Sequence, residues 1–124
     1  MNSSASVPPG WPPQVRPPGA PQWEESARNW LYDQVPGEWR RYEVLQRHPL
    51  LLARNVRYHV EGAINGHRLG YSRARVETAD HIEPPTLQQL LEADAREGAR
   101  LVALARQVRL VEDALQGVRW VPRL

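Results

Sequence analysis

The stretch EGAINGHRLG, residues 61–70, decides the fold, because it can be a turn between two strands or part of a helix. Asn65-Gly66 is a strong hairpin signal, and VRYHVE alternates apolar and polar residues as a half-buried strand does. The glycines at 62, 66 and 70, however, recur every four residues, which places them on one side of a helix. The neighbouring residues therefore have to decide between the two interpretations.

The wider segment favours the helix. Charged residues recur at steps of seven, which a strand of period two does not produce, and a second series recurs at steps of three, four or seven. The charged series is Arg47, Arg54, Glu61, Arg68 and Arg75, and the second series is Leu52, Val56, Val60, Ala63, His67 and Ala74. We therefore predict a helix over residues 49–79, with the strand hairpin as the alternative.

Another long helix is predicted over residues 85–116, where an apolar face continues up to Gly117. If the two helices fold back about a turn near Ile82, Gly66 and Gly98 lie equally far from the turn and meet where the helices cross. Each interior glycine costs roughly 1 kcal/mol relative to alanine, and close helix approach offsets that cost. On this account Gly66→Leu destabilises the fold by overpacking, by about 1–3 kcal/mol.

The N-terminal residues 1–21 form a predicted proline-rich arm, partly disordered, in front of a helical domain at residues 22–124. Proline disfavours helix interiors and central strands and favours extended polyproline II. Because the arm also carries tryptophan, we expect part of it to pack on the domain, although its P-x-x-P sequences also suit an aromatic groove. A shorter helix is predicted over residues 22–35, and the spacing of Trp39 and Tyr42 allows another short one.

These elements predict an all-α fold. It is a long antiparallel helical hairpin with a shorter N-terminal helix and an extended N-terminal arm rich in proline and tryptophan. The chain of 124 residues is one small domain at most.

Composition limits the possible functions. The chain has no cysteine, so disulfides and thiol chemistry are excluded. It has no secretion signal and no apolar window of membrane length, so we expect a cytoplasmic protein without a membrane partner. All 16 basic residues are arginine, but the net charge of +2 is far from that of a strongly basic nucleic-acid-binding protein.

No arrangement of residues indicates catalysis, a metal site or a cofactor site. The histidines at 48, 59, 67 and 81 are too scattered to hold zinc, and no serine, threonine or cysteine is arranged around them as a nucleophile. GAINGHRLG lacks the preceding strand of a phosphate-binding loop. We expect His48 to help cap the helix after it and His67 to be a polar member of the contact between the long helices.

The residues predicted to bind a partner are tryptophans, because buried aromatic anchors dominate interface energies. They are Trp11, Trp23, Trp30 and Trp39, which anchor either the arm or a partner. The arginines of the charged series can contact nucleic-acid phosphates or form a solvated helix face. The candidates for phosphate contact are Arg47, Arg54, Arg68 and Arg75.

The chain also resembles a family of short uncharacterised actinobacterial proteins. The resemblance rests on VPPGWPPQVRPPGAPQWEESARNWLYDQVP, on YEVLQRHPLLLARNV and on the helix ending in LVEDALQG, and it covers most of the chain beyond residue 6. The family's pattern is PPGWPxxVRPPGAPxW followed by VLxRHPxxLA. The resemblance implies a helical middle, since relatives are alanine-rich where this chain has glycine, and it transfers no activity and no catalytic residue.

Together these observations predict a non-catalytic protein–protein interaction protein, a scaffold or adaptor. Its expected partner is another protein or a second copy of the chain. The alternative is a nucleic-acid-associated adaptor or regulator that uses the arginine-bearing helix face.

Overall fold

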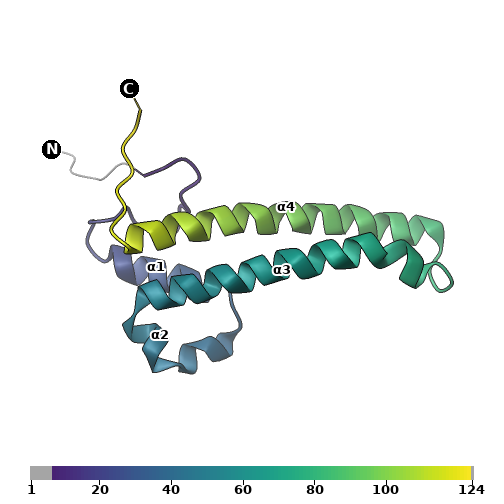
Figure 1. The fold of residues 1–124 in the computed structure, drawn as a ribbon, viewed down its shortest axis with the longest axis horizontal. Helices are drawn as coiled ribbons and strands as arrows, with labels where there is room; N and C mark the ends of the chain where they lie inside the picture. The colour runs from purple at the N-terminus through teal and green to yellow at the C-terminus, as the bar shows by residue number, and fades with distance from the viewer. Residues whose placement is uncertain (1–6, 124) are drawn as a thin grey trace. The chain divides into compact units, whose positions relative to one another are not determined.

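A computed structural model describes residues 7–123, and within these residues the fold is all-α, without strands. The elements are α1 (Trp23–Tyr32), a 3-10 helix η1 (Gly37–Arg41), α2 (Glu43–Arg47), α3 (Pro49–Thr78) and α4 (Pro84–Leu115). The long helices α3 and α4 pack antiparallel, as predicted (Figure 1). Asn65-Gly66 therefore lies inside α3, and the alternative of a strand hairpin is wrong.

Helix ends are set by local hydrogen bonds. The carbonyl of His48 accepts the backbone N–H groups of Leu51 and Leu52, so His48 caps the start of α3 through its backbone. The hydroxyl of Thr78 donates to the carbonyl of Ala74 in the last turn of the same helix. The bond from Leu51 satisfies one of the N–H groups that a helix N-terminus otherwise leaves without a partner.

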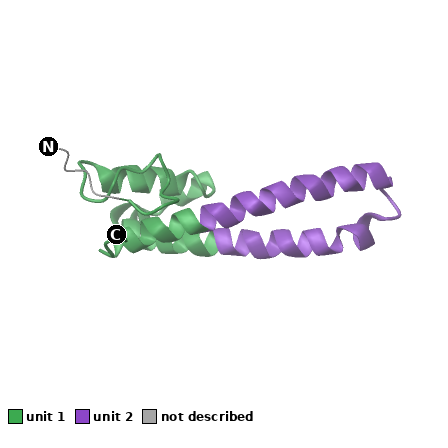
Figure 2. Cartoon of the chain, turned by 90° about the horizontal axis from the view of Figure 1, so that it is seen from above, with its two compact units in different colours: residues 1–59, 106–124 green, residues 60–105 purple. Residues whose placement is uncertain are grey.

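The chain divides into two compact units, and α3 and α4 each contribute to both (Figure 2). Unit 1 comprises Met1–His59 and Arg106–Leu124, and unit 2 comprises Val60–Ala105. In unit 1, α1 lies beside the beginning of α3 and the end of α4 (Figures 1 and 2). Its buried hydrophobic side chains are Val15, Ala27, Trp30, Leu31, Tyr32, Leu45, Leu52, Ala53, Val56, Val108 and Val111.

Unit 2 is a pair of helical segments joined at residues 79–83, and its core is smaller. The buried hydrophobic residues are Val60, Ala74, Leu91, Leu101 and Leu104. Between the helices, His67 Nε2 donates a hydrogen bond of 2.6 Å to the carbonyl of Asp94. The expectation that His67 is a polar member of the helix contact is thus confirmed.

The predicted contact between Gly66 and Gly98 is wrong. Gly66 is exposed, and a Cβ placed on it would have no heavy atom within 4 Å. A Cβ on Gly98 would instead lie 3.4 Å from Cδ2 of His67. The helix register is close to the predicted one, but one residue along a helix is a rotation of about 100°, which turns Gly66 away from α4. The overpacking predicted for Gly66→Leu therefore does not apply.

The proline-rich arm is a series of turns rather than the extended polyproline II that its composition favours. Backbone hydrogen bonds join Trp11 to Pro8, Val15 to Pro12 and Ala20 to Pro17. The sequence PPGW at residues 8–11 and PPGA at residues 17–20 each have a glycine with positive φ at the third position, as a type II turn requires. The predicted extended arm is corrected accordingly, and residues 1–6 lie outside the described part.

The arm packs on its own unit, as expected. The backbone N–H of Arg16 donates to Oγ of Ser26 in α1 at 3.0 Å, and the Ser26 hydroxyl donates to the carbonyl of Trp23. Val15 is buried, and a Cβ on Gly10 would lie 3.8 Å from Cδ1 of Leu110 in α4. The arm is thus held against α1 and α4.

Candidate interaction surfaces

A groove of about 490 Å³ lies in unit 1, between the arm, the end of α4 and the C-terminal segment. Apolar side chains dominate its lining. The lining residues are Pro8, Trp11, Pro18, Leu110, Asp113, Ala114, Val118, Arg119, Trp120, Val121 and Pro122.

One wall of the groove exists because α4 ends in a Schellman motif. The N–H of Gly117 donates to the carbonyl of Ala114, and the N–H of Val118 donates to the carbonyl of Asp113. Gly117 has φ of 86°, a left-handed conformation that glycine adopts without a Cβ penalty. The motif turns the chain, so that residues 118–122 line the groove.

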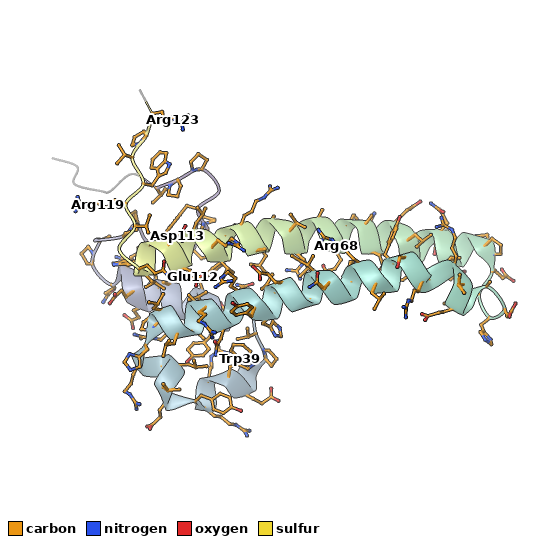
Figure 3. The ribbon with its side chains drawn as sticks, viewed as in Figure 1. Trp39, Arg68, Glu112, Asp113, Arg119 and Arg123 are labelled. Carbon is orange, nitrogen blue, oxygen red and sulfur yellow. The ribbon has the colours of Figure 1, made fainter. Side chains whose placement is uncertain are left out.

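The two indoles of the groove differ in their hydrogen bonding. Trp11 donates from Nε1 to the carbonyl of Val15 at 2.8 Å, which fixes its ring on the turn of the arm. Trp120 is 39% exposed, and within residues 7–123 its Nε1 has no recorded acceptor. Two lining side chains carry a charge: Asp113 in the last turns of α4 and Arg119 on the C-terminal segment (Figure 3). Asp113 and Arg119 form no ion pair with each other among the described contacts.

A second, shallower hollow of about 280 Å³ involves Trp39. The Trp39 ring stands edge-on to the ring of His59, with 5.5 Å between their centroids (Figure 3 labels Trp39). Tyr42 and Val44 border this hollow and are exposed. Trp39, one of the predicted anchor residues, thus lies at a surface hollow.

The remaining predicted anchors have less exposed positions. Trp30 is only 6% exposed and belongs to the core of unit 1. Trp23 begins α1 and is half-buried. Of the four predicted tryptophans, Trp11 borders the groove and Trp39 borders the second hollow. Trp120, which was not among the predicted anchors, also lines the groove.

Unit 2 exposes large apolar side chains on α3. Val76 is 86% exposed and Leu69 is 51% exposed. At 100° per residue, Leu69 lies about 180° around the helix from the buried Val60. Gly62, Leu69 and Val76 are spaced by seven residues, so they share this outer face. A Cβ on Gly62 would have no heavy atom within 4 Å, which leaves bare backbone at one end of the face.

The arginines predicted to contact phosphates differ in their contacts within the protein. Arg47 forms an exposed ion pair with Glu43 at 3.7 Å. Arg54 lies over the ring of Tyr58, with 5.1 Å from Cζ to the ring centroid. Arg68 and Arg75 are exposed on α3 in unit 2 (Figure 3 labels Arg68). Two of the four therefore have partners within the protein.

A buried ion pair that the sequence analysis missed joins α3 to α4 within unit 1. Arg57 Nε donates to Glu112 Oε1 at 2.6 Å, and both side chains are largely buried. The hydrogen bond that Arg57 donates to Glu112 raises the pKa of the guanidinium. The residues are far apart in sequence, and only the i, i+3 and i, i+4 pairs of one helix can be recognised without the register.

Tyr32 is a second buried polar residue without a role in the sequence analysis. It is 3% exposed, and its hydroxyl has no hydrogen-bond partner. The same is true of the buried Nε of Arg28, one turn earlier in α1. Burial raises the pKa of Tyr32, and the charges of Arg28 and Arg40 oppose this rise.

Among the described residues, no group of three or more His, Cys, Asp or Glu side chains is arranged to hold a metal ion. Within the same part of the chain, neither long helix has a stretch apolar enough to span a membrane. Comparison with protein-family models, with curated proteins and with solved structures finds no match. The resemblance to the actinobacterial family therefore stays an expectation from the sequence.

Proposed function

We propose that this chain is a non-catalytic interaction protein that associates with a second copy of itself through the outer face of α3 in unit 2. The observation that carries the proposal is the exposure of Leu69 and Val76 on the side opposite the buried Val60. Contiguous apolar side chains on a helix surface are characteristic of interaction sites. When two helices pack against each other, each buries one face and leaves the opposite face exposed to solvent.

The spacing on this face supports a second copy as the partner. In an antiparallel pair of α3 helices with its two-fold axis at Leu69, the Leu69 side chains of the two copies meet. Val76 then lies opposite Gly62 of the partner subunit, since both are seven residues from the axis. Glycine has no Cβ, so its backbone leaves room for the valine. Such an isologous contact closes after two subunits.

Sedimentation equilibrium over a range of concentrations tests the proposal. We expect the wild-type protein to show a monomer–dimer equilibrium and the double variant Leu69→Glu, Val76→Glu to be monomeric, with unchanged helical circular dichroism. Ala103→Glu is the control, because it adds a negative charge at an exposed position of α4. A wild-type protein that is monomeric at every concentration, or a double variant that dimerises as the wild type does, contradicts the proposal.

Gly62→Leu separates association from folding. Its side chain has open space in the single chain, and leucine favours a helix over glycine by roughly 1 kcal/mol, so we expect the monomer to become more stable. The same side chain occupies the place of Val76 of the partner subunit, so the dimer should weaken. If Gly62→Leu leaves the dimer dissociation constant unchanged, the antiparallel arrangement about Leu69 is wrong.

The second candidate is a nucleic-acid-associated adaptor, favoured by the exposed Arg68 and Arg75 on one helix. Against it, residues 60–105 contain more acidic residues than arginines. Binding to phosphates releases counterions, so the affinity for a DNA or RNA duplex must fall steeply with salt. Duplex binding that weakens in Arg68→Gln, Arg75→Gln and with added salt supports this function, and its absence at low salt removes it.

A further inference from the structure

We propose that the groove in unit 1 binds a proline-rich peptide segment that carries a basic residue. The groove is bordered by Trp11, Trp120 and three prolines, and it includes Asp113, which forms no ion pair among the described residues. This surface lies in a different unit from the face proposed for self-association, and the argument for it is independent.

The size of the groove limits the length of the ligand. An α-helix with its side chains is about 10 Å or more across, so a volume of 490 Å³ holds only about one turn of it. The same volume is typical of pockets that take a ligand the size of a short peptide. The occupant is therefore a short segment, and the walls of the groove select its conformation.

Most of the groove wall lacks the free backbone groups that strand addition needs. A peptide that adds a strand needs a row of backbone N–H and carbonyl groups to pair with. Pro8, Pro18 and Pro122 have no N–H, and the N–H of Val118 is used by the Schellman motif. A polyproline II segment requires few such bonds and docks in grooves lined by aromatic rings.

The two indoles supply what such a ligand needs. The hydrogen bond from Trp11 to Val15 holds the Trp11 ring in place before binding, so little side-chain freedom is lost when a ligand arrives. Trp120 is partly exposed, and its Nε1 can donate to a carbonyl of the bound peptide. The carbonyls of a polyproline II segment make no internal hydrogen bonds, so they are available to accept one from Trp120.

The charge at the end of α4 selects a basic residue in the ligand. Asp113 lies in the last turns of α4, and the backbone dipole of a helix adds partial negative charge at its C-terminus. The carbonyl of Asp113 is occupied by the Schellman motif, whereas its carboxylate forms no recorded ion pair in the described structure. Arg119 lies on the exposed segment after the helix and forms no ion pair with Asp113 among the described contacts. An arginine in the ligand can pair with Asp113 and stack on an indole.

The test uses the full chain and three synthetic peptides, acetyl-Arg-(Pro)6-amide, acetyl-Ala-(Pro)6-amide and a Gly-Ser peptide of equal length. Binding is followed by the ¹⁵N–¹H resonances of the tryptophan indoles and by tryptophan fluorescence. We expect both proline peptides to shift the Trp120 resonance, the arginine peptide to bind more tightly, and the Gly-Ser peptide to cause no shift.

Two variants locate the binding. Trp120→Ala, at a partly exposed position outside the core, should weaken binding of both proline peptides about tenfold or more. Asp113→Asn should weaken the arginine peptide by about two- to fivefold and leave the alanine peptide unchanged. Failure of both proline peptides to bind at millimolar concentration overturns the proposal, and so does binding that Trp120→Ala does not affect. If Asp113→Asn leaves the preference for arginine intact, the selection of a basic residue is wrong.

Discussion

His67 lies between Asp94 and Gly98, with Nε2 2.6 Å from the Asp94 carbonyl oxygen and Cδ2 3.4 Å from where a Gly98 Cβ would stand. Glycine at 98 therefore makes room for an imidazole ring rather than for another glycine. The ring donates to a backbone carbonyl of the neighbouring helix, so the contact is both close and polar. This relationship fixes how α3 and α4 meet in unit 2.

The glycines of α3 and α4 should respond differently to alanine. Gly70→Ala meets no heavy atom within 4 Å, so we expect the free energy of unfolding to rise by about 0.5–1 kcal/mol. Gly98→Ala gains the same helix propensity but places its Cβ against His67, so its net gain should be smaller. Urea denaturation of the two variants measures the difference, and a larger gain from Gly98→Ala contradicts the contact.

Removing one partner of the buried ion pair should be costly. Glu112→Ala leaves the guanidinium of Arg57 largely buried without its carboxylate, so we expect a loss of about 3 kcal/mol in the free energy of unfolding. The control is Glu97→Ala, which breaks an exposed ion pair with Arg100 and should leave the melting temperature almost unchanged. If Glu112→Ala and Glu97→Ala lower the stability equally, burial does not determine how much the pair of Arg57 and Glu112 contributes to it.

Tyr32 makes stability depend on alkaline pH. Its pKa is raised in the folded chain, so above pH 10 the unfolded chain ionises first, and stability is lost as pH rises through the folded pKa. Tyr32→Phe removes both this loss and a buried hydroxyl without a partner, so we expect about 1 kcal/mol of added stability at pH 7. Thermal melts at pH 7 and pH 11 check this, and an unchanged alkaline loss contradicts it.

Gly117 should control the shape of the groove. Its φ of 86° is unfavourable for any residue with a Cβ, so Gly117→Ala should lower the free energy of unfolding by about 1 kcal/mol. Because the Schellman motif directs residues 118–122 to the groove, the indole resonance of Trp120 should also move. Gln116→Ala, at an exposed neighbouring position, is the matched control and should leave that resonance in place. A Trp120 resonance that responds equally to both contradicts this role of Gly117.

Periodicity predicted the helices well, because a step of seven along residues 47–75 is incompatible with a strand. The predicted helix over 49–79 starts where α3 does and ends one residue later, and the predicted helix over 85–116 is shifted by one residue at each end relative to α4. The face of Gly66 could not be found by counting from the turn, since an error of one residue rotates a side chain by about 100°.

Part of the groove could be predicted from the sequence. PPGW and PPGA carry proline and glycine at the positions that a type II turn requires, and this signal identifies turns where overall proline content suggests an extended arm. The position of Trp120 opposite Trp11 depends on how the arm and the C-terminal segment meet α4, which is tertiary information. For the same reason, the sequence alone could not pair Arg57 with Glu112.

Cysteine cross-linking tests the proposed self-association most directly, because the natural chain has no cysteine. If the two-fold axis passes by Leu69, a Leu69→Cys variant brings two thiols together and forms a covalent dimer under mild oxidation. Ala103→Cys, equally exposed on α4, should remain monomeric under the same conditions. Rapid covalent dimerisation of Leu69→Cys alone is the predicted result, and equal rates for the two variants, or no dimer from Leu69→Cys, would contradict the account.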